Sequence, residues 1–290
     1  MAEPLPTCYL NGEYLPLSQA RVSPLDRGFL FADSVYEVMP VYAGRPFRFP
    51  EHCQRLTRSL AELGMEDPHD RTAWRGILAQ LIGRNGGGDL YVYWQVTRGA
   101  EYGRNHAPLP QLPRTVFAFC APLPGTSAAE RAHGLACVTA ADNRWGRCDI
   151  KSTALLANVL LRDLAARAGA AETILLRNGE LTEASASAVH VVIGGELRTP
   201  ALSHRLLPGT TRSVIEELAA RTGVPVRAAA VSESELRGAE EVLLSAATRE
   251  LSAVTRIDGH PVGAGVPGPV WERLHAALQH YKHELAETPW

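Results

Sequence analysis

Four stretches of alternating hydrophobic and polar residues are each interrupted by a short turn dipeptide. These dipeptides are Asn11-Gly12, Ala43-Gly44, Asn178-Gly179 and Asp258-Gly259. Because such pairs readily adopt the backbone of two-residue turns, we predict a β-hairpin at each position. Residues 90–97 place apolar side chains at every second position, and residues 115–120 are mostly apolar. Both segments therefore predict further strands.

Hydrophobic residues recur at helical spacing in other parts of the chain. The predicted helices cover residues 51–65, 152–168, 211–222 and about 269–286. Ser152 is the expected N-cap of the second helix and Gly169 its C-cap, because these residue types favour those ends. The third helix is expected to begin at Thr211 and to stop at Gly223.

Strands and helices do not alternate regularly, which favours an α+β fold over a doubly wound parallel sheet. A length of 290 residues is enough for about two domains. Residues 121–130 contain two prolines, a glycine and small side chains, so they are the best linker candidate. We therefore expect a smaller N-terminal domain over 1–120 and a larger C-terminal domain over 131–290.

Composition excludes several classes of protein. Hydrophobic residues make up 46% and charged residues 21%, which disfavours intrinsic disorder. The net charge of −2 gives no sign of nucleic-acid binding, and no apolar run approaches a membrane span. The N-terminus lacks the pattern of a secretory signal. Five cysteines without a C-x-x-C pair argue against a disulfide framework or zinc ribbon, and fit a reducing cytoplasm.

Lysine is rare in this chain. Of 29 basic residues, two are lysine, Lys151 and Lys282, and the other 27 are arginine. An amine can lose its proton and attack a carbonyl, whereas guanidinium stays charged. Lys282 is expected to be a solvated charge near a helix end. Lys151 precedes an apolar run, so it is a candidate for chemistry, with a structural role equally open.

Two further segments carry residues suited to binding an anion or a cation. Thr210 and Thr211 follow Gly209 at a predicted helix start, where backbone N–H groups can hold a phosphate. The alternative is that one of these threonines simply caps the helix. Glu183 lies in a strand of small and apolar residues and would need a cationic partner if buried. A strand-edge carboxylate facing water is the alternative.

Arg104 and His106 are two residues apart in an extended segment, so both side chains can face one carboxylate. A surface loop with no role is the default alternative. His280 and His283 share a helix face, but with no obvious third ligand we expect a solvated surface and no metal site. The absence of G-x-S-x-G and H-E-x-x-H removes support for two hydrolase classes.

Several motifs, in order along nearly the whole chain, resemble the fold-type IV aminotransferases. This pyridoxal-phosphate family includes branched-chain and D-amino acid aminotransferases and aminodeoxychorismate lyase. The main matching segments are residues 23–47, 51–56, 93–99, 143–160, 181–189, 206–215 and 241–250. The resemblance implies a small N-terminal α/β domain, a larger C-terminal mixed-sheet domain, and a homodimer with its site between the domains.

The resemblance also implies roles for individual residues. Lys151 would form the Schiff base with pyridoxal 5'-phosphate, and Glu183 would bond the pyridinium nitrogen. Other family positions would also serve the cofactor: Arg55, Thr210 and Thr211 on the phosphate, Leu207 on the ring, and the backbone of Ala247 near the phosphate. Ala246-Ala247 replaces the usual Ser or Thr, Ala188 the frequent Asn, and His190 the usual apolar residue.

Within the family, the pattern Arg104-x-His106 and Tyr36 resemble the α-carboxylate trap of D-amino acid aminotransferase. The implied reaction is ping-pong transamination between a D-amino acid and a 2-oxo acid, either 2-oxoglutarate or pyruvate. Four alternatives stay open: an L-branched-chain aminotransferase, a lyase, an (R)-amine transaminase, and a dimeric protein without cofactor. The expected partners are small-molecule amino acids and 2-oxo acids, and we expect neither nucleic acid nor membrane binding. The expected location is the cytoplasm.

Overall fold

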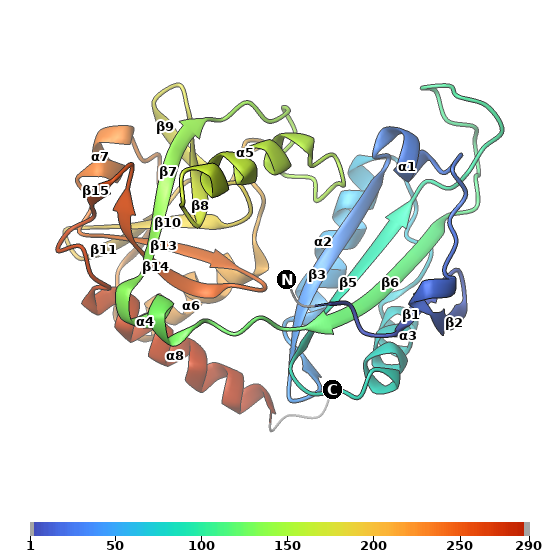
Figure 1. Cartoon of the computed structure of the whole chain (residues 1–290), viewed down its shortest axis with the longest axis horizontal. Helices are drawn as coiled ribbons and strands as arrows, with labels where there is room; N and C mark the ends of the chain where they lie inside the picture. Colours follow the sequence, from blue (N-terminus) through green and yellow to red (C-terminus); the bar gives the residue numbers. More distant parts are fainter. Residues whose placement is uncertain (1–2, 287–290) are drawn as a thin grey trace. The chain divides into compact units, whose positions relative to one another are not determined.

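The computed structural model describes residues 3–286, which form two compact units (Figure 1). The first unit contains the chain up to Pro124 together with Ile150–Ala154, and the second contains Gly125–Asp149 and Leu155–Glu284. The boundary after Pro124 lies inside the predicted linker 121–130. The five residues Ile150–Ala154 join the first unit from a distant point in the chain, which a simple division into 1–120 and 131–290 does not include.

The first unit is built on a six-stranded antiparallel sheet with the order β2-β1-β6-β5-β3-β4. In β5, Leu90, Val92, Trp94 and Val96 are almost fully buried, which confirms the predicted alternation. The strands are β1 (Thr7–Leu10), β2 (Glu13–Pro16), β3 (Ser34–Tyr42), β4 (Arg45–Pro46), β5 (Leu90–Thr97) and β6 (Thr115–Pro122).

Two long helices cover this sheet. Helix α2 (Phe49–Glu62) packs on β3, and α3 (Arg71–Arg84) packs on β1 and β6. Their buried side chains, such as Leu56 and Trp74, form one core with the sheet. Helix α2 matches the predicted helix 51–65 with shifted ends, whereas α3 was not predicted. The unit also contains the short 3-10 helix η1 (Leu17–Gln19) and the one-turn helix α1 (Arg27–Phe31).

The second unit is built on a nine-stranded mixed sheet within the described residues. The pairs β11–β12, β14–β7 and β7–β8 are parallel, and the other pairs are antiparallel. The predicted mixed sheet is thus present. Its strands are β7 (Leu135–Ala141), β8 (Glu172–Arg177), β9 (Glu180–Ala184), β10 (Ala188–Ile193), β11 (Glu196–Thr199), β12 (Val226–Ala228), β13 (Glu241–Ala246), β14 (Glu250–Ile257) and β15 (His260–Pro261).

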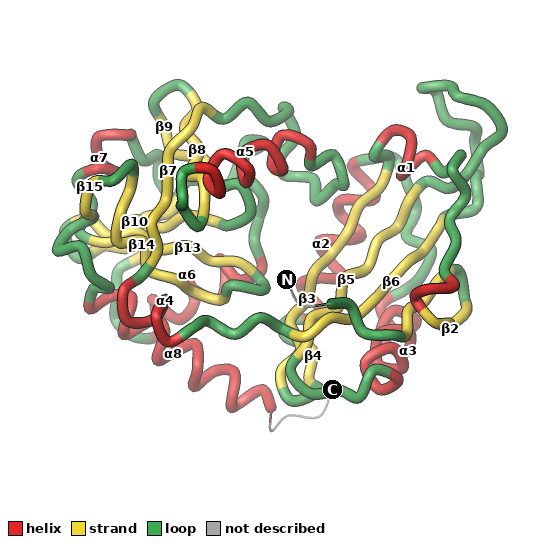
Figure 2. The backbone as a smooth tube through the Cα atoms, in the orientation of Figure 1, coloured by secondary structure: helices red, strands yellow, loops and turns green. Residues whose placement is uncertain are grey.

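Helices of the second unit pack on its sheet and are drawn in red in Figure 2. Helix α5 packs on β7 and β8, and α6 packs on β12 and β13. The helices are α4 (Ala128–His133), α5 (Leu156–Arg167), α6 (Thr210–Arg221), α7 (Glu233–Arg237) and α8 (Pro269–Ala286). In the described chain, no helix combines the length and the apolar character that a membrane crossing requires.

The turn predictions hold, but two predictions about helix ends are wrong. All four dipeptides join antiparallel strands, and Asn178 and Asp258 adopt φ values of 56° and 51°. Ser152 is not an N-cap, because it forms a β-bridge with Val35 and α5 begins only at Leu156. The C-cap of α5 is Ala168, and Gly169 is the next residue, with a positive φ.

Lys282 is also not the solvated charge that we expected. Its Nζ lies 2.6 Å from Glu250 Oε1 and 2.9 Å from Gln279 Oε1. The lysine side chain is 18% exposed. Lys282 therefore links α8 to β14, and its role is structural.

Candidate active site

Lys151 lies in a loop fixed to β3 within the first unit. Its carbonyl accepts the Tyr36 N–H at 3.0 Å, and its own N–H donates to Ser59 Oγ at 3.3 Å. Its Nζ lies 4.3 Å from the centre of the Tyr36 ring. No carboxylate pairs with Nζ among the described residues of this unit. Backbone hydrogen bonds thus hold the main chain at Lys151 in a defined place.

Arg55, on α2, belongs to a buried charge cluster with Glu37. Its Nε and Nη2 each lie 2.7 Å from a carboxylate oxygen of Glu37, and His52 Nδ1 lies 2.7 Å from Oε2. Burial alone would raise the pKa of Glu37, but the charge and hydrogen bonds of Arg55 and His52 lower it to about 2. Burial lowers the pKa of His52. The cluster therefore holds one edge of the Arg55 guanidinium in place.

Glu37 and His52 were not predicted as parts of the site, although the sequence carried a signal. His52 and Arg55 are three residues apart on one helix, so they share a face. Glu37 follows Tyr36 on β3, within a motif that the family resemblance used. Only the pairing of α2 with β3 reveals that both basic side chains meet the same carboxylate.

The three residues of the proposed carboxylate trap fall into two groups. Tyr36 stacks on Tyr93 with ring centres 5.4 Å apart, beside Lys151. Arg104 and His106 are exposed and both contact Phe31, the first with its Cζ 5.2 Å from the ring centre and the second at 5.5 Å between rings. Within the described first unit, no hydrogen bond or ring contact joins Tyr36 to either of them.

Glu183 lies in β9 of the second unit and is 7% exposed. Arg144 Nη1 donates to its Oε1, and the Leu207 N–H donates to its Oε2 at 3.1 Å. Burial raises the pKa of Glu183, and the Arg144 guanidinium acts in the opposite direction. The solvated strand-edge alternative is therefore wrong, and Arg144 is the cationic partner that burial required.

Arg144 was missed at the sequence level because its partners are not local. It also donates to both carboxylate oxygens of Asp142, with Nε at 2.9 Å and Nη2 at 3.0 Å. Asp142 directly follows β7, and Glu183 lies in β9. Their side chains meet at Arg144 because β7 and β9 both pair with β8.

Thr210 and Thr211 are buried in the first turn of α6. The N-cap is Gly209, and no side chain caps this end of the helix. The alternative of a threonine N-cap is therefore wrong. Ala247 lies in the turn between β13 and β14 and has no hydroxyl. An uncapped N-terminus of a long helix is suited to a phosphate.

His190 is completely buried in β10. Its Nε2 lies 2.8 Å from Ser245 Oγ on β13, and its Nδ1 has no partner in the described structure. Burial lowers the pKa of His190 to about 3. The side chain is thus a neutral part of the core, where the family usually has an apolar residue.

Comparison with known proteins gives the family. The model of the family described as "Amino-transferase class IV" matches residues 34–257. A D-alanine aminotransferase of Listeria innocua serovar 6a is 37% identical over 92% of this chain and 92% of its own. A D-alanine aminotransferase of Bacillus licheniformis is 37% identical over 93% of this chain and 94% of its own.

Solved structures of branched-chain aminotransferases have the same fold. That of the Escherichia coli enzyme has a TM-score of 0.90 and 26% identity, covering 99% of this chain and 97% of its own. That of the T.th. enzyme, determined with pyridoxamine 5'-phosphate, has a TM-score of 0.88 and 25% identity, with 98% and 96% coverage. The predicted fold-type IV architecture is therefore confirmed.

Proposed function

The chain belongs to the class IV aminotransferases, and on that premise we propose that it moves an amino group from a D-amino acid to a 2-oxo acid. The observation that carries this proposal is the pair Arg104 and His106, which lie together on the Phe31 ring. A guanidinium can bind a substrate carboxylate with two hydrogen bonds. Relatives named D-alanine aminotransferase support the same substrate class.

The proposed cofactor is pyridoxal 5'-phosphate, and the chemistry of the side chains fits it. The first unit offers an amine at Lys151 and a buried guanidinium at Arg55. The second offers a buried carboxylate at Glu183 and an uncapped helix start at Thr210. These groups match an aldehyde, a phosphate and a ring nitrogen. When bound, this cofactor withdraws electrons from the substrate Cα.

The chain's own residues would then bind and orient the cofactor and move protons to and from the substrate. Lys151 Nζ would take the proton from the substrate Cα and later return it. Glu183 would hold a proton on the ring nitrogen, with Arg144 keeping the carboxylate in position. Arg55 and the start of α6 would anchor the phosphate, and Leu207 would pack on the ring. Near Ala247, backbone N–H groups would serve in place of hydroxyls.

A second candidate function is L-branched-chain transamination, which the close likeness to branched-chain aminotransferase structures favours. The scaffold can serve both hands of substrate, so the fold does not decide between them. The groups that hold the carboxylate decide instead. We infer the D-hand from Arg104 and His106, with Tyr36 as a further contact.

The experiment is to supply the purified holoenzyme with D-alanine and 2-oxoglutarate. The proposal predicts equimolar pyruvate and D-glutamate, which chiral chromatography identifies. L-leucine with the same acceptor tests the branched-chain alternative, and aminodeoxychorismate alone tests the lyase. (R)-1-phenylethylamine tests the amine transaminase. Formation of L-glutamate from L-leucine, without D-glutamate from D-alanine, would contradict the proposal.

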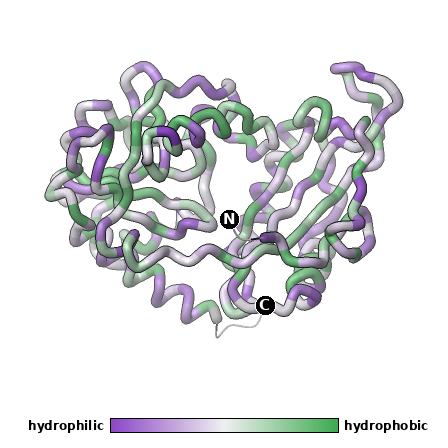
Figure 3. Tube along the Cα trace, viewed as in Figure 1, coloured by the Kyte–Doolittle hydropathy of each residue, from purple (hydrophilic) through white to green (hydrophobic). Residues whose placement is uncertain are grey.

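We further propose a homodimer in a reducing cytoplasm. Helix α5 exposes Leu156, Val159, Leu160 and Leu164, with exposures of 73, 60, 58 and 43%. Much of this helix is accordingly green in Figure 3. Such an exposed apolar stripe is suited to a second chain. All five cysteines are free and buried, which agrees with a reducing compartment. Analytical ultracentrifugation tests the dimer.

A further inference from the structure

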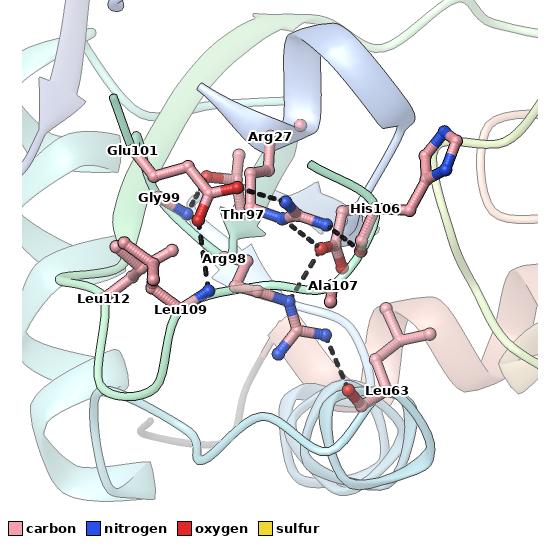
Figure 4. Close-up of polar contacts among 12 residues, drawn as sticks. Arg27, Leu63, Thr97, Arg98, Gly99, Glu101, His106, Ala107, Leu109 and Leu112 are labelled. Carbon is pink, nitrogen blue, oxygen red and sulfur yellow. Dashed lines mark hydrogen bonds and ion pairs between the residues drawn. The ribbon is translucent and has the colours of Figure 1, made fainter. Parts of the chain in front are cut away.

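A buried arginine ties down the loop that carries Arg104 and His106. Arg27 begins α1 and is 3% exposed. Its Nη1 donates to the carbonyl of Asn105 at 2.7 Å, and its Nη2 donates to the carbonyl of His106 at 2.8 Å (Figure 4). One guanidinium therefore holds two consecutive carbonyl groups of this loop, while the His106 ring points away from the cluster.

Two carboxylates in turn hold Arg27. Its Nη1 lies 2.5 Å from Glu101 Oε1, and its Nε lies 2.9 Å from Asp33 Oδ2. The other oxygen of Glu101 accepts the Leu109 N–H at 3.1 Å. The Leu109 hydrogen bond and the Arg27 charge hold the pKa of Glu101 below its usual range, so this carboxylate stays ionised. The Arg27–Glu101 pair thus binds the loop at two places, at Asn105 and His106 in its middle and at Leu109 near its end.

The loop has little else to hold it. Residues 102–110 are exposed and form no helix or strand, and they belong to the long green connection between β5 and β6 in Figure 2. In the described part of the chain, the hydrogen bonds that join residues 102–109 to the rest of the first unit come from Arg27 and Glu101. The place of the loop therefore depends on this ion pair.

Helix α1 also supplies the surface on which the two loop side chains lie. Phe31 is the last residue of α1, and Arg27 Cζ lies 4.7 Å from the centre of its ring. Arg104 and His106 contact the same ring. The two ends of α1 therefore contact the loop in different ways. Arg27, its first residue, binds the loop backbone, and Phe31, its last residue, packs against the loop side chains.

We propose that Arg27 is a positioning residue for the substrate. It holds residues 102–109 so that Arg104 and His106 face one substrate carboxylate. The inference rests on the proposed function and extends it to a residue that does not itself touch substrate. Losing Arg27 weakens carboxylate binding and spares the chemical step, because Lys151 is held by other contacts.

The test begins with the holoenzyme of Arg27→Lys. A lysine keeps the charge but cannot donate as a planar fork to two carbonyls and two carboxylates. We expect KM for D-alanine to rise about tenfold and kcat to change less than about twofold. Arg98→Lys is the matched control. Arg98 donates to the same Asp33 and to the Leu63 carbonyl, but not to the loop, so its KM is expected to stay unchanged.

A mutant cycle separates positioning from general support of the fold. The background is the double variant Arg104→Ala with His106→Ala, which lacks both proposed carboxylate contacts. If Arg27 acts through those side chains, adding Arg27→Lys to this background changes KM by less than about twofold. If the effects multiply instead, Arg27 acts elsewhere and the inference is wrong.

Hydrogen exchange gives a readout that does not depend on activity. In Arg27→Lys, the amides of Ala107 and Leu109 are expected to exchange faster, and those of β5 to be unchanged. If Arg27→Lys showed faster exchange but a wild-type KM, the positioning role of Arg27 would be wrong, and the proposed function would still stand. A wild-type enzyme that turns over no D-amino acid would overturn the proposed function, and this inference with it.

Discussion

Among single residues, the amine of Lys151 is central to the proposed chemistry. Lys151 is one of two lysines in the chain, and the other is used in an ion pair with Glu250. We expect Lys151→Arg to abolish transamination, because guanidinium neither attacks an aldehyde nor carries protons near neutral pH. The thermal midpoint should stay within a few degrees, since the loop is held by backbone contacts. Normal turnover in Lys151→Arg would refute the assignment.

Glu183 gives a second test at this scale. Under the proposed function, Glu183→Gln would remove the carboxylate that holds a proton on the ring nitrogen of the cofactor. We expect kcat to fall at least about a hundredfold, as when a key electrostatic contact is removed. Glu180→Gln is the control, because Glu180 lies on the same strand but pairs with Arg205 at the surface. Steady-state rates with saturating D-alanine measure both variants. Equal rates would show that the buried carboxylate is structural.

At the scale of elements, the pair of strands β10 and β13 encloses an acid-sensitive group. His190 has a pKa of about 3 in the folded protein, well below its ordinary value of 6.5. At pH values between these two pKa values, His190 is therefore protonated in the unfolded chain and neutral in the folded chain. Stability from this residue is complete above about pH 6.5 and falls by up to about 1.4 kcal/mol per pH unit below it.

His190→Leu removes the difference in proton binding between the folded and unfolded chain that His190 causes. We expect its free energy of unfolding to fall less steeply than that of wild type between about pH 6 and pH 5. Urea denaturation at a series of pH values measures both slopes. Identical slopes would mean that His190 is protonated equally in the folded and unfolded chain.

The elements that could be predicted are those whose causes are local. The Asn178-Gly179 and Asp258-Gly259 turns and the alternation in residues 90–97 follow from a few neighbouring side chains. The supposed cap at Ser152 failed because its real partner, Val35, is distant in the sequence.

The candidate site shows the same limit. The chemistry of Lys151 and Glu183 could be proposed from residue type and context. The partners that hold charged groups could not, because sheet pairing brings them together. Arg144 reaches Glu183 across β8, and Arg27 holds a loop that begins after the far end of β5. Local patterns thus nominated candidate reactive groups, and long-range pairing supplied the residues that hold them.

At the scale of the whole molecule, two kinds of similarity point to different substrates. The fold is that of branched-chain aminotransferase structures at 25 to 26% identity. The sequence is 37% identical to D-alanine aminotransferases over nearly the full chain. Because one scaffold can serve several substrates, side chains that meet the carboxylate carry more weight than backbone likeness. The side chains that we propose for that contact are Arg104 and His106.

The most direct test is a single-turnover comparison of enantiomers. The cofactor-loaded protein is mixed with D-alanine, L-alanine, L-valine or L-leucine, and the loss of the cofactor's visible absorbance is followed. We expect a second-order rate constant for D-alanine at least about a hundredfold above that of each L-amino acid. A protein that reacts faster with L-valine or L-leucine than with D-alanine would contradict it.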